Sequence, residues 1–184
     1  MVIVTTDHGT YNGDHGQVGK LQTHMYQGIS HIPMVIWHPK LGHGKRIKQL
    51  VQPIDIFATV LDAVGLDAPE GVHGRSLIPL LANGQSEDWR ASALFGRCHL
   101  ECNLTDGEYV LYNRLRANEK PSGQGGDTRR QCETKLIHLG SDAGEENDLS
   151  LSCPDQLSRM QRMLVEKLKE IEAPREMFVQ YGLY

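Results

Sequence analysis

The stretch V-I-V-T-T-D-H-G-T-Y-N-G-D-H-G-Q-V-G-K, residues 2–20, decides the fold. It opens on an apolar run from Val2 to Thr5, which predicts a strand buried on both faces, as in a parallel sheet covered by helices. The run from Ile32 to Trp37 has the same character. The two runs are joined by about 25 polar, glycine-rich residues, and a connection of that length inside a compact domain is usually functional. The sequence therefore predicts an α/β sheet with an active-site connection.

The chain after this pair of strands is predicted to be helical. Pro53 in the first turn and Gly65 beyond the end suit the two ends of a helix. The apolar residues between them recur at helical spacing: Ile54, Phe57, Leu61 and Val64. A further short apolar helix is expected within Glu70 to Leu81. Residues 1–91 are therefore interpreted as one α/β unit.

Residues 92–184 have a different sequence pattern and are predicted to form a small α+β subdomain. Short antiparallel strands are expected at Leu94–Leu104, Tyr109–Arg114 and Lys135–Leu139, with Thr105-Asp106-Gly107 as a hairpin turn. The segment Glu119–Arg130 has loop chemistry. The last predicted helix begins near Pro154 and presents one apolar face: Leu157, Met160, Leu164, Leu168 and Ile171. The predicted arrangement is an antiparallel sheet covered by one helix.

Composition excludes several classes of function. A net charge of −4 gives no basic field of the kind that binds a phosphate backbone, so we expect no nucleic acid partner. No window approaches the roughly 18 apolar residues of a membrane-spanning helix. The cysteines are too irregularly spaced for a zinc ribbon or a redox pair, and both disulfides and free thiols stay open for them: Cys98, Cys102, Cys132 and Cys153.

Asp7 and His8 stand at the carboxyl end of the first predicted strand, where ligands collect in open α/β sheets. A carboxylate followed by an imidazole offers one oxygen and one nitrogen donor to a divalent cation. Lys20 adds a point charge that can hold an anionic oxygen. Taken alone, the pair also fits a turn-forming Asp beside a surface His, and a single Lys among glycines is commonly solvated. The residues favour a site for a metal and an oxyanion.

A series of motifs in order carries a resemblance to a known family. The motifs are T-T-D-H-G, G-D-H-G, G-K, M-Y-Q-G-I-S-H-I-P-M-V-I-W-H-P, Q-P-I-D-I-F-A-T-V-L-D-A-V-G-L and V-H-G-R-S-L-I-P-L-L. They are followed by T-D-G-E-Y-V-L-Y and K-L-I-H-L-G-S-D-A-G-E-E-N-D-L-S. The series closely resembles the C-terminal portion of sulfatases of the alkaline-phosphatase-like superfamily, over nearly the whole chain. The resemblance implies the C-terminal part of an alkaline-phosphatase-like sandwich.

The resemblance also implies roles for individual residues. Asp7 and His8 match the second pair of ligands for a divalent metal, usually calcium in sulfatases. An Asp-His pair resembles the branch that includes iduronate-type sulfatases and phosphonate or choline-ester relatives. Lys20 matches the lysine that contacts the sulfate group and stabilises charge in catalysis. His15, in the G-D-H-G loop at the mouth of the site, is expected on the substrate side.

Two parts of the family's active site have no counterpart in this sequence. The nucleophile is a formylglycine made within a C/S-x-P-x-R motif, and none of the four cysteines is followed by x-P-x-R; Ser30 and Ser76 fail the same test. The first pair of metal-binding aspartates has no counterpart before Val2. We therefore expect no sulfatase activity from this chain alone, weak calcium affinity and a tendency to self-associate.

The predicted function is thus that of the C-terminal portion of a metal-dependent sulfuric ester hydrolase, acting on a sulfated small molecule or glycan. The alternatives are a phosphonate or phosphodiester hydrolase of the same superfamily, and a non-catalytic binding or structural protein. The substrate and the compartment stay open, with periplasmic, secreted and lysosome-like locations all compatible with the family.

Overall fold

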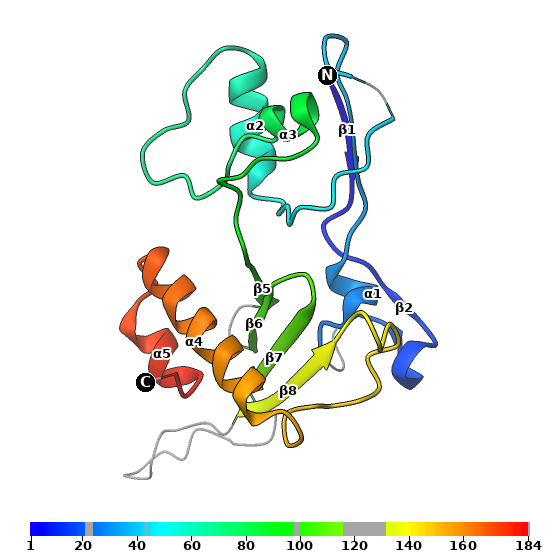
Figure 1. Cartoon of the computed structure of the whole chain (residues 1–184), viewed down its shortest axis with the longest axis vertical. Coiled ribbons are helices and arrows are strands. Elements are labelled where there is room, and N and C mark those ends of the chain that lie inside the picture. Colours follow the sequence, from blue (N-terminus) through cyan, green and yellow to red (C-terminus); the bar gives the residue numbers. More distant parts are fainter. Residues whose placement is uncertain (21–23, 43, 98–99, 116–131, 184) are drawn as a thin grey trace.

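The structure is a computed structural model that describes residues 1–20, 24–42, 44–97, 100–115 and 132–183. Figure 1 shows two lobes: one holds β1, β4, α2 and α3, and the other holds β5 to β8 with α4 and α5. The short elements α1 and β2 lie beside the second lobe although they come from the first 30 residues. The predicted α/β class, with a small antiparallel sheet after the first unit, is confirmed.

The first lobe contains a two-stranded sheet. Strand β1 (Val2–Thr5) pairs with β4 (Met34–Trp37), with Val2 opposite Trp37 and Val4 opposite Val35. The pairing is antiparallel, so the predicted parallel arrangement is wrong, and β4 begins two residues later than predicted. Opposed residues share a face of the sheet, and on this face Val4 and Val35 are 61% and 63% exposed. An apolar run of residues is typical of a strand that is buried on both faces. In this structure the described residues bury β1 and β4 only in part, so valines on one face of their sheet are exposed.

The helices of the first lobe match the predictions. Helix α2 (Asp55–Ala63) follows Pro53, and Gly65 takes a left-handed φ of 77° just beyond its end, as a glycine in a C-cap does. Helix α3 (Ile78–Asn83) is the expected short apolar helix. The two helices are joined by a buried hydrogen bond from the Leu77 amide to Thr59 Oγ1, 2.9 Å long. Part of the apolar face of α2, including Ile54 and Phe57, is exposed.

The second lobe is built on an antiparallel four-stranded sheet in the order β5-β6-β7-β8. Its strands are β5 (Ala93–Arg97), β6 (Glu101–Thr105), β7 (Tyr109–Leu115) and β8 (Cys132–His138). The stretch predicted as a single strand over residues 94–104 is in fact the two strands β5 and β6. The predicted turn between β6 and β7 is confirmed: Asp106 Oδ1 accepts from the Tyr109 amide at 2.7 Å, and Gly107 has a φ of 90°.

One face of this sheet packs against α4 (Pro154–Glu170), the predicted covering helix. The core between them is fully apolar in its centre, because the helix places Leu164 and Leu168 against Leu111 and Leu136 of the sheet. Helix α5 (Arg175–Gln180), which the sequence patterns did not predict, follows and brings Tyr181 and Leu183 to the edge of the same core. None of the helices in the described ranges has the length and apolar character needed to cross a membrane.

The other face of the sheet is covered by residues from the beginning of the chain. These belong to or flank β2 (Tyr11–Asn12), the 3-10 turn η1 (Asp14–Gly16), β3 (Val18–Gly19) and α1 (Gln27–Ser30). The packed side chains are Tyr11, Tyr26, Ile29, Val110, Tyr112 and Ile137. The boundary between residues 91 and 92 stays a prediction. The predicted loop over residues 119–130 lies outside the described residues.

Candidate functional site

The structure brings Asp7, His8 and Lys20 together at the end of β1. Lys20 Nζ lies 2.9 Å from His8 Nε2, and the same ring nitrogen lies 3.4 Å from Asp7 Oδ2. Lys20 returns to this position because β2 and β3 pair antiparallel and fold the chain back. The three side chains are thus a local cluster at the carboxyl end of a strand, where the sequence predicted a site.

The hydrogen bonds of His8 define which ring nitrogen is available to a ligand. Its Nδ1 lies 2.8 Å from the carbonyl oxygen of Gly9, which can only accept, so Nδ1 carries the proton in the neutral ring. The Nε2 atom then accepts from Lys20 Nζ, and Asp7 Oδ2 lies 3.4 Å from it. A histidine whose one nitrogen donates to a backbone carbonyl is oriented as metal-binding histidines are.

Asp7 is largely exposed, with 84% of its side chain accessible. Desolvation raises the pKa of its carboxyl group, but the neighbouring His8 side chain and the hydrogen bond from the His8 amide outweigh it. The pKa therefore lies below its usual value, and Asp7 is ionised at neutral pH. An ionised carboxylate beside an unprotonated imidazole nitrogen is a suitable pair of ligands for a divalent cation.

These two donors fill only part of a coordination shell. Within the described ranges of the chain, no group of three or more His, Cys, Asp or Glu side chains is placed to hold a metal ion. Calcium takes six to eight oxygen ligands. Asp7 can supply one such oxygen and His8 offers a nitrogen donor, so a divalent cation at this pair would need its other ligands from elsewhere.

Gly9 ties this cluster to α1. Its amide donates to the Ile29 carbonyl at 2.9 Å, and a Cβ atom at position 9 would lie 1.9 Å from the Gly28 oxygen. The close approach of two backbones requires glycine at this position. The loop that carries Asp7 and His8 is thereby held against α1.

His15 lies near this cluster in sequence but has different partners. Its ring stacks on Tyr26, with 3.8 Å between ring centroids and 18° between planes, and its backbone is left-handed with a φ of 51°. In the described part of the chain, no hydrogen bond, ion pair or ring contact joins His15 to Asp7, His8 or Lys20. The structure thus places the predicted substrate-side residue on an aromatic platform of its own.

The sequence patterns did not single out the buried polar groups beneath this platform. Glu145 is 5% exposed and accepts from the Gln27 amide at 2.7 Å and from the Tyr112 hydroxyl. His24 is also buried, and desolvation lowers its pKa although Glu133 lies 3.3 Å away and raises it. No local pattern reveals these pairs, because their members are far apart along the chain.

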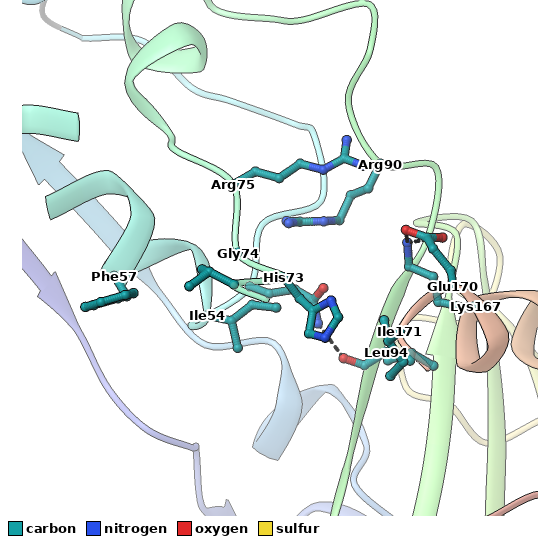
Figure 2. A pocket seen from close by; sticks show the side chains of 12 residues that line it. Ile54, Phe57, His73, Gly74, Arg75, Arg90, Leu94, Lys167, Glu170 and Ile171 are labelled. Carbon is teal, nitrogen blue, oxygen red and sulfur yellow. Dashed lines mark hydrogen bonds and ion pairs between the residues drawn. The ribbon is translucent and has the colours of Figure 1, made fainter. Parts of the chain in front are cut away.

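A pocket of about 510 Å³ lies between the two lobes, away from the Asp7 cluster. Figure 2 shows it between the start of α2, the segment around His73 and the end of α4. Its arginine and lysine side chains are already engaged: Arg90 with Asp55, Lys167 with Glu170, and Arg75 with the Asp88 carbonyl oxygen. The pocket contains none of the predicted site residues and has no assigned ligand.

Comparison with known proteins identifies the class to which this architecture corresponds. A family profile described as "N-sulphoglucosamine sulphohydrolase, C-terminal" matches residues 13–100, which include His15 and Lys20 but neither Asp7 nor His8. Arylsulfatase K of Xenopus laevis is 27% identical over 173 residues, covering 89% of this chain and 30% of that protein. Arylsulfatase K of Canis lupus familiaris is 35% identical over 120 residues, covering 60% and 21%. The chain spans about a third of the length of these curated relatives or less.

Solved structures show the same fold. The structure of BT4656 in complex with its substrate D-glucosamine-2-N,6-O-disulfate has a TM-score of 0.79 at 20% identity, with 94% of this chain and 35% of that chain covered. The phosphonate monoester hydrolase SpPMH from Silicibacter pomeroyi has a TM-score of 0.73 at 23% identity, with coverage of 91% and 34%. The resemblance to the C-terminal portion of sulfatases is therefore confirmed. Membership of the Asp-His branch stays a prediction.

Proposed function

We propose that this chain supplies one half of the active site of a sulfuric ester hydrolase. Asp7 and His8 are the metal-binding pair, Lys20 contacts the sulfate group, and His15 lies on the substrate side. The observation that carries the proposal is the convergence of Lys20 Nζ and Asp7 Oδ2 on His8 Nε2, at 2.9 and 3.4 Å. The similarity to arylsulfatase K and to the N-sulphoglucosamine sulphohydrolase profile supports it.

The chain's own residues do the work of charge stabilisation in this proposal. A bound divalent cation, for which we propose calcium, would polarise a sulfate oxygen. Lys20 would hold a second oxygen and stabilise the negative charge that grows there in the transition state. His8, whose Nδ1 lies 2.8 Å from the Gly9 carbonyl oxygen, would offer its Nε2 atom to the cation. The formylglycine nucleophile is not encoded in these 184 residues, so we expect no turnover from the chain alone.

The proposed substrate is a sulfated small molecule or glycan. The solved structure of BT4656 contains a doubly sulfated glucosamine as its substrate, and that likeness supports the class of ligand rather than its identity. The ammonium group of Lys20 can bind an anion. Because the Asp7 side chain beside it is exposed, such a group can approach from solvent. The compartment in which such a substrate would be met stays open.

Hydrolysis of phosphonates or phosphodiesters is the second candidate function. An Asp-His pair permits it, and the phosphonate monoester hydrolase from Silicibacter pomeroyi shares the fold. Tetrahedral phosphonate and sulfate groups make similar demands on Lys20. A non-catalytic module that retains the cluster is the third candidate, and it predicts no binding of either anion.

Isothermal titration of the chain with calcium and then with inorganic sulfate tests the proposal. We expect weak calcium binding, with a Kd on the order of 1 mM because only two of the ligands are present. The double variant Asp7→Asn/His8→Gln should abolish the calcium heat. Lys20→Met should weaken sulfate binding by about ten- to a hundredfold and leave calcium binding unchanged, since removing a charge-assisted hydrogen bond costs roughly 1.5–3 kcal/mol. Lys48→Met, at an exposed position elsewhere in the first lobe, is the matched control.

Competition with methylphosphonate separates the candidate functions. If methylphosphonate displaces bound sulfate at a concentration below that of sulfate, the site prefers phosphonate. That result favours the phosphonate hydrolase. Calcium and sulfate heats that are the same in the wild-type chain and in both site variants would contradict the proposed site and leave the non-catalytic reading.

A further inference from the structure

Glu145 is a buried carboxylate that the proposed chemistry does not use. It lies in the second lobe, after β8, and its Oε2 atom accepts from the Gln27 amide at 2.7 Å, while Oε1 accepts from the Tyr112 hydroxyl. Gln27 is the first residue of α1, and Tyr26, at the N-cap position, makes no side-chain cap. Glu145 therefore satisfies an amide that the helix itself leaves without a partner, from 118 residues away in sequence.

Tyr26, the aromatic platform on which His15 stacks, is also held by residues of the second lobe. Tyr26 carries the stacked His15 ring, and its ring meets Tyr112 edge-on at 5.1 Å between centroids. Its hydroxyl accepts from Lys135 Nζ at 3.0 Å. Tyr112 and Lys135 belong to β7 and β8, so the sheet of the second lobe fixes the ring on which His15 rests.

The same short helix also holds the Asp7 and His8 loop. The Gly9 amide donates to Ile29, the third residue of α1, and the backbone at Gly9 packs against Gly28. Tyr26 and Ile29 thus connect the second lobe to both parts of the candidate site. His15 and Glu145 both have left-handed backbones, at φ 51° and 55°, which persist in non-glycine residues only when the surroundings impose them.

We propose that Glu145 is a positioning residue for the site: through the Gln27 amide and the Tyr112 hydroxyl it fixes α1 and Tyr26, and thereby the orientation of His15. Burial raises the pKa of Glu145, and the bonds from Tyr112 and Gln27 oppose that change by favouring the ionised acceptor. The substrate-side role of His15 rests on the proposed function. The orientation of the His15 ring is a property of the fold and does not depend on that function.

The test is a comparison of Glu145→Gln with Glu146→Gln in the full 184-residue chain, followed by NMR of the histidine rings. The glutamine at 145 retains one accepting oxygen but turns an NH₂ group toward one of two donors, so it cannot satisfy both. In the wild-type chain the His15 ring protons, assigned with His15→Gln, should be shifted upfield by the face of Tyr26. We expect this shift to be lost in Glu145→Gln and kept in Glu146→Gln, whose side chain is exposed.

Tyr112→Phe provides a second variant if Glu145→Gln does not fold. It removes the hydroxyl donor and keeps the ring, and we expect a partial loss of the His15 shift at temperatures well below the melting temperature. A purely structural role for Glu145 would lower the melting temperature while leaving the His15 shift intact below it, and that result would overturn the proposal. Failure of the proposed function would appear instead as absent calcium and sulfate heats with the His15 shift still sensitive to Glu145.

Discussion

At the scale of single residues, the ion pair between Asp55 and Arg90 connects α2 to the segment before β5. Asp55 is fully buried and holds Arg90 in a bidentate pair, with Nη2 to Oδ1 at 2.6 Å. We expect Arg90→Met to lower the free energy of unfolding by about 3–5 kcal/mol, because it leaves a buried carboxylate without its counter-charge. Urea denaturation measures the difference.

Arg75→Met is the control for this prediction. Arg75 reaches the same carboxylate only through its backbone amide, at 2.9 Å, and that bond survives the substitution. Its exposed side chain should therefore contribute within about 0.5 kcal/mol. Equal losses at positions 75 and 90 would show that the Asp55 pair has no special role.

The turn between β6 and β7 provides a prediction on pH. Desolvation raises the pKa of Asp106. The hydrogen bonds from the amides of Tyr109 and Glu108 and from the guanidinium of Arg159 together lower the pKa by more, so it lies below the ordinary 3.8. A depressed folded pKa stabilises the protein above the unfolded pKa, and this stabilisation is lost as pH falls through the folded value. Asp106→Asn should therefore cost about 1–2 kcal/mol at pH 7 and less near pH 2.5, where protonation has begun to remove the stabilisation.

Urea unfolding at both pH values measures this dependence. Asp67→Asn, at an exposed position, should change the free energy of unfolding little at either pH. A loss at Asp106 that is the same at pH 7 and near pH 2.5 would mean that its charge is not the cause.

The sequence predicted the proximity of those candidate residues that are close together along the chain, while their roles stay a prediction. Asp7, His8 and Lys20 lie within 20 residues of the N-terminus, and the glycines between them allow the chain to fold back, so motif order alone indicated a cluster. Asp55 and Glu145 were not predicted, because their partners lie 35 and 118 residues away. Only the tertiary fold creates their burial, and burial gives these carboxylates their importance.

At the scale of elements, α4 carries the core of the second lobe. Leu164 is fully buried in the apolar cluster that includes Leu111 and Leu136 of the sheet. We expect Leu164→Ala to lower the free energy of unfolding by about 2–5 kcal/mol, through lost burial and the cavity left behind. Glu166→Ala changes an exposed residue of the same helix and should have an effect within about 0.5 kcal/mol. Equal effects at positions 164 and 166, measured by thermal or urea unfolding, would contradict the packing described.

Periodicity predicted helices better than it predicted strand pairing. The apolar spacing of α4 and α2 identifies both helices, since a helical face repeats within the element itself. The direction of β1 relative to β4 was wrong, because an apolar run indicates burial and not the direction of the neighbouring strand. The sequence patterns predicted the hairpin of β5 and β6 as one strand because the connection between them, from Arg97 to Glu101, is short.

At the scale of the whole molecule, the first lobe leaves an apolar surface exposed. Val4 and Val35 oppose each other on one face of the β1–β4 sheet, with Val2 and Trp37 beside them and Phe57 of α2 also accessible. A two-stranded sheet also has unpaired edges that can pair with another chain. We therefore expect the 184-residue chain to self-associate, with a weight-average mass that rises above 20.6 kDa as concentration increases.

Sedimentation of a charged variant tests whether this face is responsible. Val4→Lys/Val35→Glu places an opposed pair of charges across the strands, which preserves cross-strand attraction while making association through the face costly. This variant should sediment as a monomer at concentrations where the wild type associates. Val18→Lys alters a valine on β3 that is even more exposed, and it should leave association unchanged. A wild-type chain that is monomeric throughout, or a Val18→Lys chain that dissociates as well, would mean that the β1–β4 face is not the surface that drives assembly.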